Sequence, residues 1–269
     1  MRVTIIHHPR LHRHATISRQ LIAIIVVIVL TSIAAVALAR FAKPQSAFDL
    51  QRVSAPLILA ATTNTFLRMF VSYIISLVVA VPLGVLIVST PRVQRILLPI
   101  ADVLQSVPVL AFFPVVVVYF AVSHDYELAA IFVIVMTMIW NIVFPVVGGL
   151  QTIPDDINSA AVVFKVSGFK RFWNITLPAI FPFIVTGSLL AWAQGWTIVI
   201  VAEVLHTYIP NGTMSQDLLG LGSLLVDSNA QGHTALFVAT ISAMIALVTL
   251  LNLFVWQPLL RLAQRFRFD

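Results

Sequence analysis

The sequence predicts an all-α polytopic membrane protein with about six transmembrane helices. Of its 269 residues, 60% are hydrophobic and only 10% are charged, and the mean hydropathy is +1.02. Soluble domains carry about 25% charged residues, because their surfaces face water. Too few charges remain here to cover a water-exposed surface, so the surface of this chain must be solvated largely by lipid.

Six uncharged runs are each long enough to cross a bilayer, which takes about 20 apolar residues. They contain no Asp, Glu, Lys or Arg and cover residues 21–39, 69–90, 103–123, 128–153, 172–202 and 228–260. Their apolarity is continuous rather than alternating, which predicts helices and not barrel strands. Five spans are the alternative, because residues 37–39 (Ala-Leu-Ala) resemble a signal-peptidase site. The length of the first apolar run favours an uncleaved span.

The distribution of basic residues predicts the orientation in an inner (plasma) membrane. With the N-terminus inside, twelve of the 16 basic residues face the cytoplasm: Arg2, Arg10, Arg13, Arg19, Arg92, Arg95, Lys165, Lys170, Arg171, Arg261, Arg265 and Arg267. The other four surround the first external loop: Arg40, Lys43, Arg52 and Arg68. The remaining external segments, around 124–127 and 206–233, carry acids and no Lys or Arg. We therefore expect both termini in the cytoplasm, a basic cytoplasmic tail over 1–20 and one transmembrane domain over 21–269.

Composition also bears on other classes of function. The net charge of +6 is explained by basic anchors facing anionic lipid, and no aromatic-interleaved basic patch indicates nucleic acid. The absence of cysteine excludes disulfides and thiolate metal sites. Four histidines, His7, His8, His12 and His14, are loosely spaced in the tail, where a solvated tail is favoured over a metal site. No Gly-rich phosphate loop or nucleophile–base pair is present, so we expect neither an enzyme, nor catalytic or metal-binding residues, nor a cofactor bound by this chain.

Prolines and small residues predict two features of the bundle. Pro108 should break the third span, leaving a short segment from Ile96 followed by the part that crosses, because proline removes a backbone donor and disfavours helix at the preceding residue. Small residues in the fifth span favour close helix packing over a substrate path: Gly187, Ser188, Ala191, Ala193 and Gly195.

The longest predicted cytoplasmic loop, 151–178, has helical signals of its own. Pro154 and two acids after it favour a helix start, and Ser167-Gly168 ends that helix before a second short one over 169–176. Aromatic residues at helical spacing, Phe169, Phe172 and Trp173, lie beside two basic residues. This arrangement predicts a docking surface for another protein. The alternative is an amphipathic hairpin that lies on lipid.

The run over 159–178 resembles the EAA loop of type I ABC importer permeases. That loop reads approximately Glu-Ala-Ala, a Gly four residues further on, and Leu-Pro at its end; Ala160-Ala161 and Leu177-Pro178 match it without a gap. Ser159 replaces the usual Glu, and Lys165 replaces the usual Gly, whose turn Gly168 could take over. The resemblance implies that an ATPase contacts Ser159, Ala160, Ala161, Phe164, Lys165, Gly168, Phe169, Phe172, Trp173, Leu177 and Pro178.

The resemblance extends from about Phe66 to the C-terminus. The stretches 196–203 and 220–225 are similar to the branch that imports nitrate, sulfonates, taurine or bicarbonate. The resemblance implies the type I ABC importer permease fold and transport of a small solute, with an anion expected. It also implies a cytoplasmic ABC ATPase dimer that carries ATP and Mg²⁺, a second permease copy (the same or a related chain) and an external solute-binding protein.

Glu203 is the acid set against the outer part of the fifth span, after Gln194 and Trp196. A charge within hydrocarbon costs about 3 kcal/mol or more, so Glu203 should face water or a partner. It is either an interfacial acid reaching the headgroups or a pathway or gate residue paired with a base such as Arg68. We therefore name Glu203, Gln194, Trp196 and Arg68 as pathway or gate candidates. An ion-coupled secondary transporter is the alternative class, but it would need matched broken helices in two halves and charges at the midplane.

Overall fold

The computed structural model describes residues 54–121, 125–209 and 211–266. The basic tail over 1–20 and the first predicted span over 21–39 lie outside these ranges. Every regular element in the described ranges is a helix, which confirms the predicted all-α class.

Four helical stretches of the described chain are long and apolar enough to cross a membrane. They are α2 (Ala55–Val88), α5 (Tyr126–Gln151), α8 (Leu177–Glu203) with α7 (Gly168–Arg171) and η1 (Phe172–Thr176) before it, and α10 (Thr234–Leu251), which continues through η4 (Asn252–Trp256), α11 (Gln257–Ala263) and η5 (Gln264–Phe266). The two internal segments η1 and η4 are π-helical. Each is followed by one residue and then by a proline: Leu177-Pro178 follows η1, and Gln257-Pro258 follows η4. A widened turn there accommodates the proline ring, which would clash with a carbonyl in a regular helix.

The third predicted span is two helices that meet at a sharp bend. α3 (Pro91–Ser106) and α4 (Val109–Ala121) are inclined by 79° across Val107 and Pro108. Val107 is extended, with φ −77° and ψ 123°, as the residue before a proline prefers. The predicted break is confirmed, although α3 begins at Pro91, capped by the Thr90 side chain, rather than at Ile96. Counted as one span, this pair brings the described chain to five, so the total of six stays a prediction.

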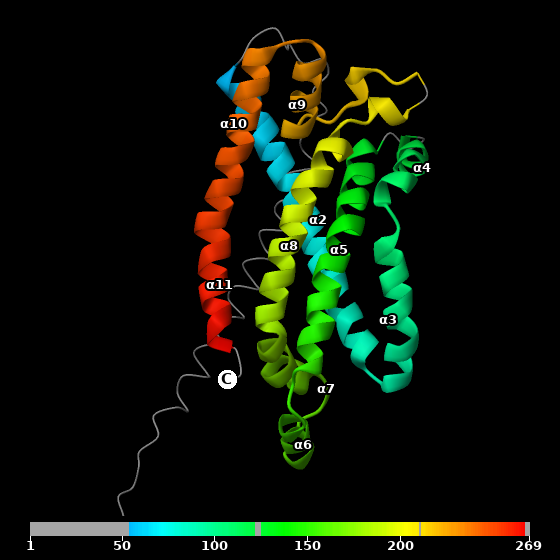
Figure 1. Ribbon diagram of the computed structural model, residues 1–269, viewed down its shortest axis with the longest axis vertical. Helices are drawn as coiled ribbons and strands as arrows, with labels where there is room; N and C mark the ends of the chain where they lie inside the picture. The colour runs from blue at the N-terminus through cyan, green and yellow to red at the C-terminus, as the bar shows by residue number, and fades with distance from the viewer. Residues whose placement is uncertain (1–53, 122–124, 210, 267–269) are drawn as a thin grey trace, which may run out of the picture.

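The core is the packing of α5 between α2 and α8 (Figure 1). α5 buries twelve residues along its length, which is why it carries no charge after Glu127. Two glycines of α8 allow the close approach: a Cβ at Gly187 would lie 2.8 Å from the Asn141 carbonyl oxygen, and one at Gly195 would lie 2.2 Å from the Met138 methyl carbon. The predicted packing role is confirmed for Gly187, Ser188, Ala191 and Gly195, which are buried, but not for Ala193, which is exposed.

The helices divide the molecule into two ends (Figure 1). The α6 end contains α6 (Asp155–Val163), α7, the turn between α2 and α3, and the end of η5. The α9 end contains α9 (Leu221–Ala230) together with η2 (His206–Tyr208) and η3 (Met214–Gln216). The described parts of the predicted cytoplasmic loops thus share one end, and the described part of the predicted external segment 206–233 lies at the other. Which end faces the cytoplasm stays a prediction.

Two predicted boundaries are wrong. α2 begins at Ala55 rather than at residue 69, so Arg68 lies inside a long helix and not in an external loop. Residues 228–230 belong to α9, which ends at a turn where Gly232 has φ +71°, before α10 begins. Both errors arise because the predicted spans were taken to begin and end at charged residues. Arg68 is paired inside the protein and does not end its helix, whereas the turn at Gly232 carries no charge and does end one.

The loop at the end of α6 departs from the usual choice of residue. The amides of Lys165 and Val166 donate to the carbonyls of Val162 and Ala161 at 3.0 and 2.8 Å, which is the Schellman arrangement that ends many helices. Lys165 has φ +52°, and Gly168 has φ +56°. Gly168 has therefore not replaced the turn at 165; the chain makes both turns, one of them with a lysine.

Lys165→Gly should stabilise this helix end by about 1 kcal/mol, because the left-handed conformation costs a side-chain-bearing residue about that much. Hydrogen exchange of the Val166 amide should slow about fivefold, which is that free energy expressed as an equilibrium ratio. Lys170→Gly, within helix α7, is the matched control and should instead speed local exchange. Unchanged exchange in Lys165→Gly would show that the left-handed turn stores no strain.

Candidate functional site

A buried ion-pair network joins four helices at the α9 end. Arg68 of α2 forms a two-pronged pair with Glu127 of α5, with its Nε donating to Oε2 at 2.8 Å and its Nη2 to Oε1 at 2.7 Å. Its Nη1 donates to Oε1 of Glu203, the last residue of α8. Arg68 is 4% exposed and Glu203 is fully buried. The predicted pairing of these two residues is confirmed, and Glu203 is not an interfacial acid reaching the headgroups.

The same carboxylate also receives the start of α9. The Gly222 amide donates to Glu203 Oε2 at 2.7 Å, and the Thr65 hydroxyl donates to Oε1 at 2.7 Å. The Leu221 amide donates to the Thr65 hydroxyl at 2.8 Å. A helix N-terminus presents free amides and a partial positive charge, so an anion is favourable there. Glu203 is thus held by Arg68 from one side and by the α9 N-terminus from the other.

Glycine is required where α9 meets this carboxylate. A Cβ at Gly220 would lie 2.2 Å from the Glu203 carboxyl carbon, and one at Gly222 would lie 2.8 Å from its Oε2. Real Cβ atoms do not approach other atoms so closely, and the Glu203 side chain that either Cβ would meet is fully buried and packed. The glycines at 220 and 222, part of the stretch that resembles the nitrate and bicarbonate branch, therefore let α9 begin directly on Glu203.

A cavity of about 490 Å³ lies at the bend between α3 and α4, against α5 and α8. Its polar lining is uncharged and consists of Gln105, Ser106, Thr137, Trp140, Asn141, Gln194 and Thr197. Thr137, Asn141 and Thr197 bond to carbonyls of their own helices, whereas Gln105 and Gln194 are exposed and make no side-chain hydrogen bond within the described chain. Their amide groups can therefore hydrogen-bond a solute.

The four pathway candidates separate into different places. Gln194 lines the cavity, whereas Arg68 and Glu203 belong to the buried network and are not among the residues that line it. Trp196 is half-buried and lies against Trp192, with ring centroids 6.2 Å apart. The sequence places these residues in one region but does not tell which face of its helix each one occupies.

The predicted ATPase-contacting residues also divide into exposed and buried groups. Phe164 and Phe169 are 77% and 75% exposed at the α6 end, and Ser159, Ala160, Lys165 and Gly168 are exposed beside them. Ala161 and Leu177 are buried, while Phe172, Trp173 and Pro178 are half-buried. Trp173 contacts Phe169 and Phe172 edge-on, at 5.5 and 6.0 Å between centroids. The exposed group, together with Val162 and Val163, forms an apolar surface that we call the α6 knob.

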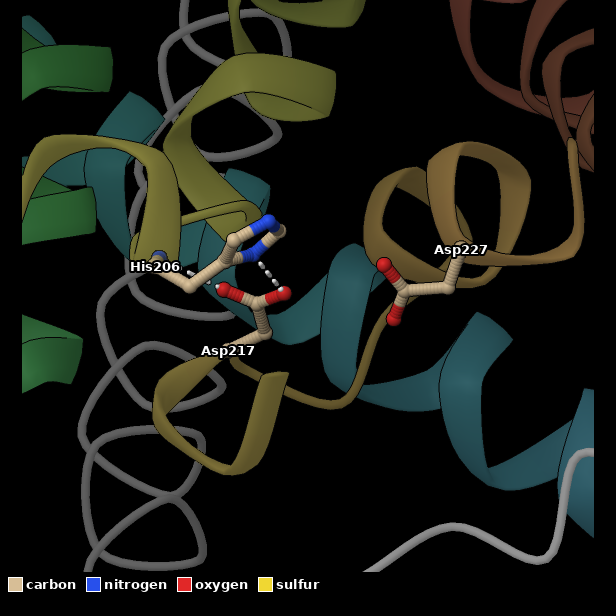
Figure 2. A group of neighbouring side chains, drawn as sticks. All are labelled: His206, Asp217 and Asp227. Carbon is tan, nitrogen blue, oxygen red and sulfur yellow. Dashed lines mark hydrogen bonds and ion pairs between the residues drawn. The ribbon is translucent and has the colours of Figure 1, made fainter. Parts of the chain in front are cut away.

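A second cluster at the α9 end was not predicted. His206, Asp217 and Asp227 have ligand-capable atoms that all lie within 4.8 Å of one another (Figure 2). The His206 amide and ring Nδ1 lie 2.8 and 2.6 Å from the two Asp217 carboxylate oxygens. The pKa of Asp227 is raised to about 6, chiefly because burial disfavours the charged carboxylate and also because Asp217 is close, while His206 partly offsets the rise. The available signal was an external segment, 204–233, with two acids and two histidines but no Lys or Arg.

The fold and these sites define a class of protein. The chain is an all-helical, multi-pass membrane protein with a bent third span, a polar cavity at the bend and an exposed apolar loop at one end. It belongs to the family described as the binding-protein-dependent transport system inner membrane component, whose sequence profile matches residues 80–256. This range contains the α6 knob, the cavity and Glu203.

Characterised relatives of the chain are permeases of anion and taurine import systems. The nitrate import permease protein NrtB of Leptolyngbya laminosa is 36% identical over 156 residues, 58% of this chain and 55% of that protein. The bicarbonate transport system permease protein CmpB of Synechococcus elongatus is 27% identical over 194 residues, 72% of this chain and 66% of that protein. The taurine transport system permease protein TauC of Escherichia coli is 26% identical over 157 residues, 58% of this chain and 54% of that protein. The match spans about half to two thirds of each relative, and the resemblance to this branch of type I importer permeases is confirmed.

Proposed function

We propose that this chain is the membrane-spanning permease subunit of an ATP-driven importer for a small anion of the nitrate, bicarbonate or sulfonate kind. One observation supports this proposal most. The α6 knob exposes two phenylalanines and two valines at the end of the bundle, where nothing in the described chain covers them. Val162, Val163 and Phe164 lie at the end of α6, outside the long apolar stretches, and Phe169 lies in α7 at the very start of the stretch Gly168–Glu203. Large exposed apolar groups of this kind mark protein interaction sites. A cytoplasmic ABC ATPase dimer, which carries ATP and Mg²⁺, is the partner that fits this position.

The cavity supports the second half of the proposal. Its uncharged polar lining offers the side-chain amides of Gln105 and Gln194 as donors to an anion, without a fixed positive charge. A translocation pathway must bind its solute weakly enough to release it, and neutral hydrogen-bond donors are compatible with that requirement. The second permease copy would complete the pathway beside the bend of α3 and α4, and the external binding protein would deliver the solute at the α9 end.

A secondary transporter is supported less well. Such a protein couples transport to an ion through acids near the midplane and through broken helices in both halves. In the described chain Glu203 is bonded to Arg68, Thr65 and the α9 N-terminus rather than lining the cavity. The α3–α4 bend also has no counterpart among the other apolar spans of the described residues.

The test is uptake of nitrate, bicarbonate or taurine by proteoliposomes that contain the full chain, its cognate ATPase and its binding protein. We expect ATP-dependent uptake of at least one of them, and we expect Gln194→Ala to lower it about tenfold, which is the effect of losing one hydrogen bond to a charged group. Gln257→Ala, an exposed glutamine outside the cavity, is the matched control and should transport normally. Uptake driven by an ion gradient without ATP would contradict the proposal, as would purification of a folded chain that never binds an ATPase.

A further inference from the structure

The unpredicted cluster at the α9 end connects three separate pieces of chain. His206 begins η2, three residues after the end of α8, and Asp217 directly follows η3. Asp227 lies in the middle of α9 and comes from the other side, with its carboxylate directed towards the other two side chains (Figure 2). A group bound between them would therefore join both ends of the segment 204–220 to α9.

The Asp227 side chain has no hydrogen-bond partner among the residues that the structure describes. It is 1% exposed, and neither carboxylate oxygen accepts a hydrogen bond in the described chain. Buried polar atoms are normally satisfied, and a buried carboxylate without a hydrogen bond or cation is strongly unfavourable. The segment 204–233 contains no Lys or Arg that could supply the missing charge. Arg68, the buried arginine at this end, is already paired with Glu127 and Glu203.

We propose that His206, Asp217 and Asp227 bind a divalent transition-metal ion of the zinc type. A neutral imidazole and two carboxylates carry a charge of −2, which one divalent ion balances. One nitrogen and two oxygen ligands suit Zn²⁺, whereas Ca²⁺ and Mg²⁺ prefer oxygen ligands alone. Water would complete the coordination. Asp217 contacts the His206 ring at Nδ1 and so orients it, while the Asp227 carboxylate makes no hydrogen bond in the described chain.

The consequence is a clamp on the segment between α8 and α9. This segment begins beside Glu203, whose backbone carbonyl accepts from the Leu218 amide at 3.0 Å. The ion would fix the segment to α9 through Asp227. The Arg68–Glu203 network holds the start of α9 through the Gly222 amide. This inference rests on the side chains of the α9 end alone and stands or falls independently of the solute and the ATPase.

The experiment measures Zn²⁺ binding to the purified full chain in detergent by isothermal titration calorimetry. Every variant, including the reference, has His7, His8, His12 and His14 replaced by Gln and carries no histidine tag, so that the N-terminal tail adds no sites. The reference should bind one equivalent of Zn²⁺. Asp227→Asn and His206→Gln should each weaken that affinity at least about 100-fold, since even residues behind the ligands contribute 10- to 100-fold. His233→Gln, a half-exposed histidine of the same segment, is the matched control and should bind as the reference does.

Thermal unfolding separates lost binding from lost folding. In chelator, Asp227→Asn should melt no lower than the reference, because it removes an unpartnered charge. Added Zn²⁺ should raise the melting temperature of the reference but not that of Asp227→Asn. The proposal is overturned if the reference binds no stoichiometric Zn²⁺, or if His206→Gln or Asp227→Asn binds Zn²⁺ with unchanged affinity.

Discussion

Glu203→Leu should destabilise the protein by about 3 kcal/mol or more, the largest effect expected of any single change in the described chain. Removing one member of a buried ion pair is strongly destabilising, and here it leaves Glu127, whose side chain is 54% exposed, as the remaining partner of the buried Arg68. Here the change also removes the acceptor for the Thr65 hydroxyl and the Gly222 amide, so the start of α9 loses its anchor. Arg68→Leu should be as damaging, because it leaves Glu203 fully buried without a cation.

The measurement is thermal or denaturant unfolding of the detergent-solubilised chain, arranged as a double-mutant cycle. Arg68→Leu with Glu203→Leu should be less destabilised than the sum of the single changes, because no charge remains unpaired between them. Glu127→Gln is the control, since its side chain is 54% exposed and water can replace its bonds; about 1 kcal/mol is expected. If Glu203→Leu unfolds with the reference midpoint, the network does not stabilise the fold.

Phe164→Ala combined with Phe169→Ala should weaken ATPase association about 100-fold or more, if the α6 knob is the docking surface as proposed. Each ring is about three-quarters exposed, so its removal leaves the permease fold intact. Buried aromatic anchors contribute about 2 kcal/mol or more each at an interface, and tenfold in affinity corresponds to 1.4 kcal/mol. Association can be measured by co-purification and by titration of the ATPase against the permease in nanodiscs.

Phe254→Ala is the matched control for this prediction. Phe254 is 73% exposed, but it lies in η4 within a predicted membrane span, where lipid and not a soluble partner would cover it. It should leave ATPase association unchanged. Phe172→Ala is expected to act differently again, because that ring packs against the core and its loss lowers stability. Equal association by the double variant and the reference would favour the amphipathic hairpin on lipid.

The contrast between Phe169 and Phe172 illustrates what local pattern can predict. Helical spacing correctly predicted helix α6 and a helical backbone for both rings, but the second helix of the loop is not a separate short one: α7 and η1 run on directly into α8. It could not tell that Phe172 turns towards the core while Phe169 does not. That difference depends on how the π-helical turn joins α8, and therefore on tertiary packing.

Lys165 shows where sequence and structure agree on an unusual feature. The position is one where glycine is expected, and the lysine does adopt φ +52°. The backbone turn is fixed by the two hydrogen bonds that end α6, so the chain accepts the strain instead of moving the turn to Gly168.

By itself, the sequence determined the membrane environment, the helical class, the bend at Pro108 and the family resemblance of the loop over 151–178. Each of these follows from local chemistry: apolar runs as long as a bilayer, a missing backbone donor, or a motif of fixed spacing. Only the tertiary structure decided that Arg68 lies inside α2, bonded to Glu203, rather than in a loop. It alone brought His206, Asp217 and Asp227 together and turned Gln194, but not Trp196, into the cavity. Those facts depend on which helix faces meet and on residues 59 to 135 positions apart coming into contact, which no local pattern encodes.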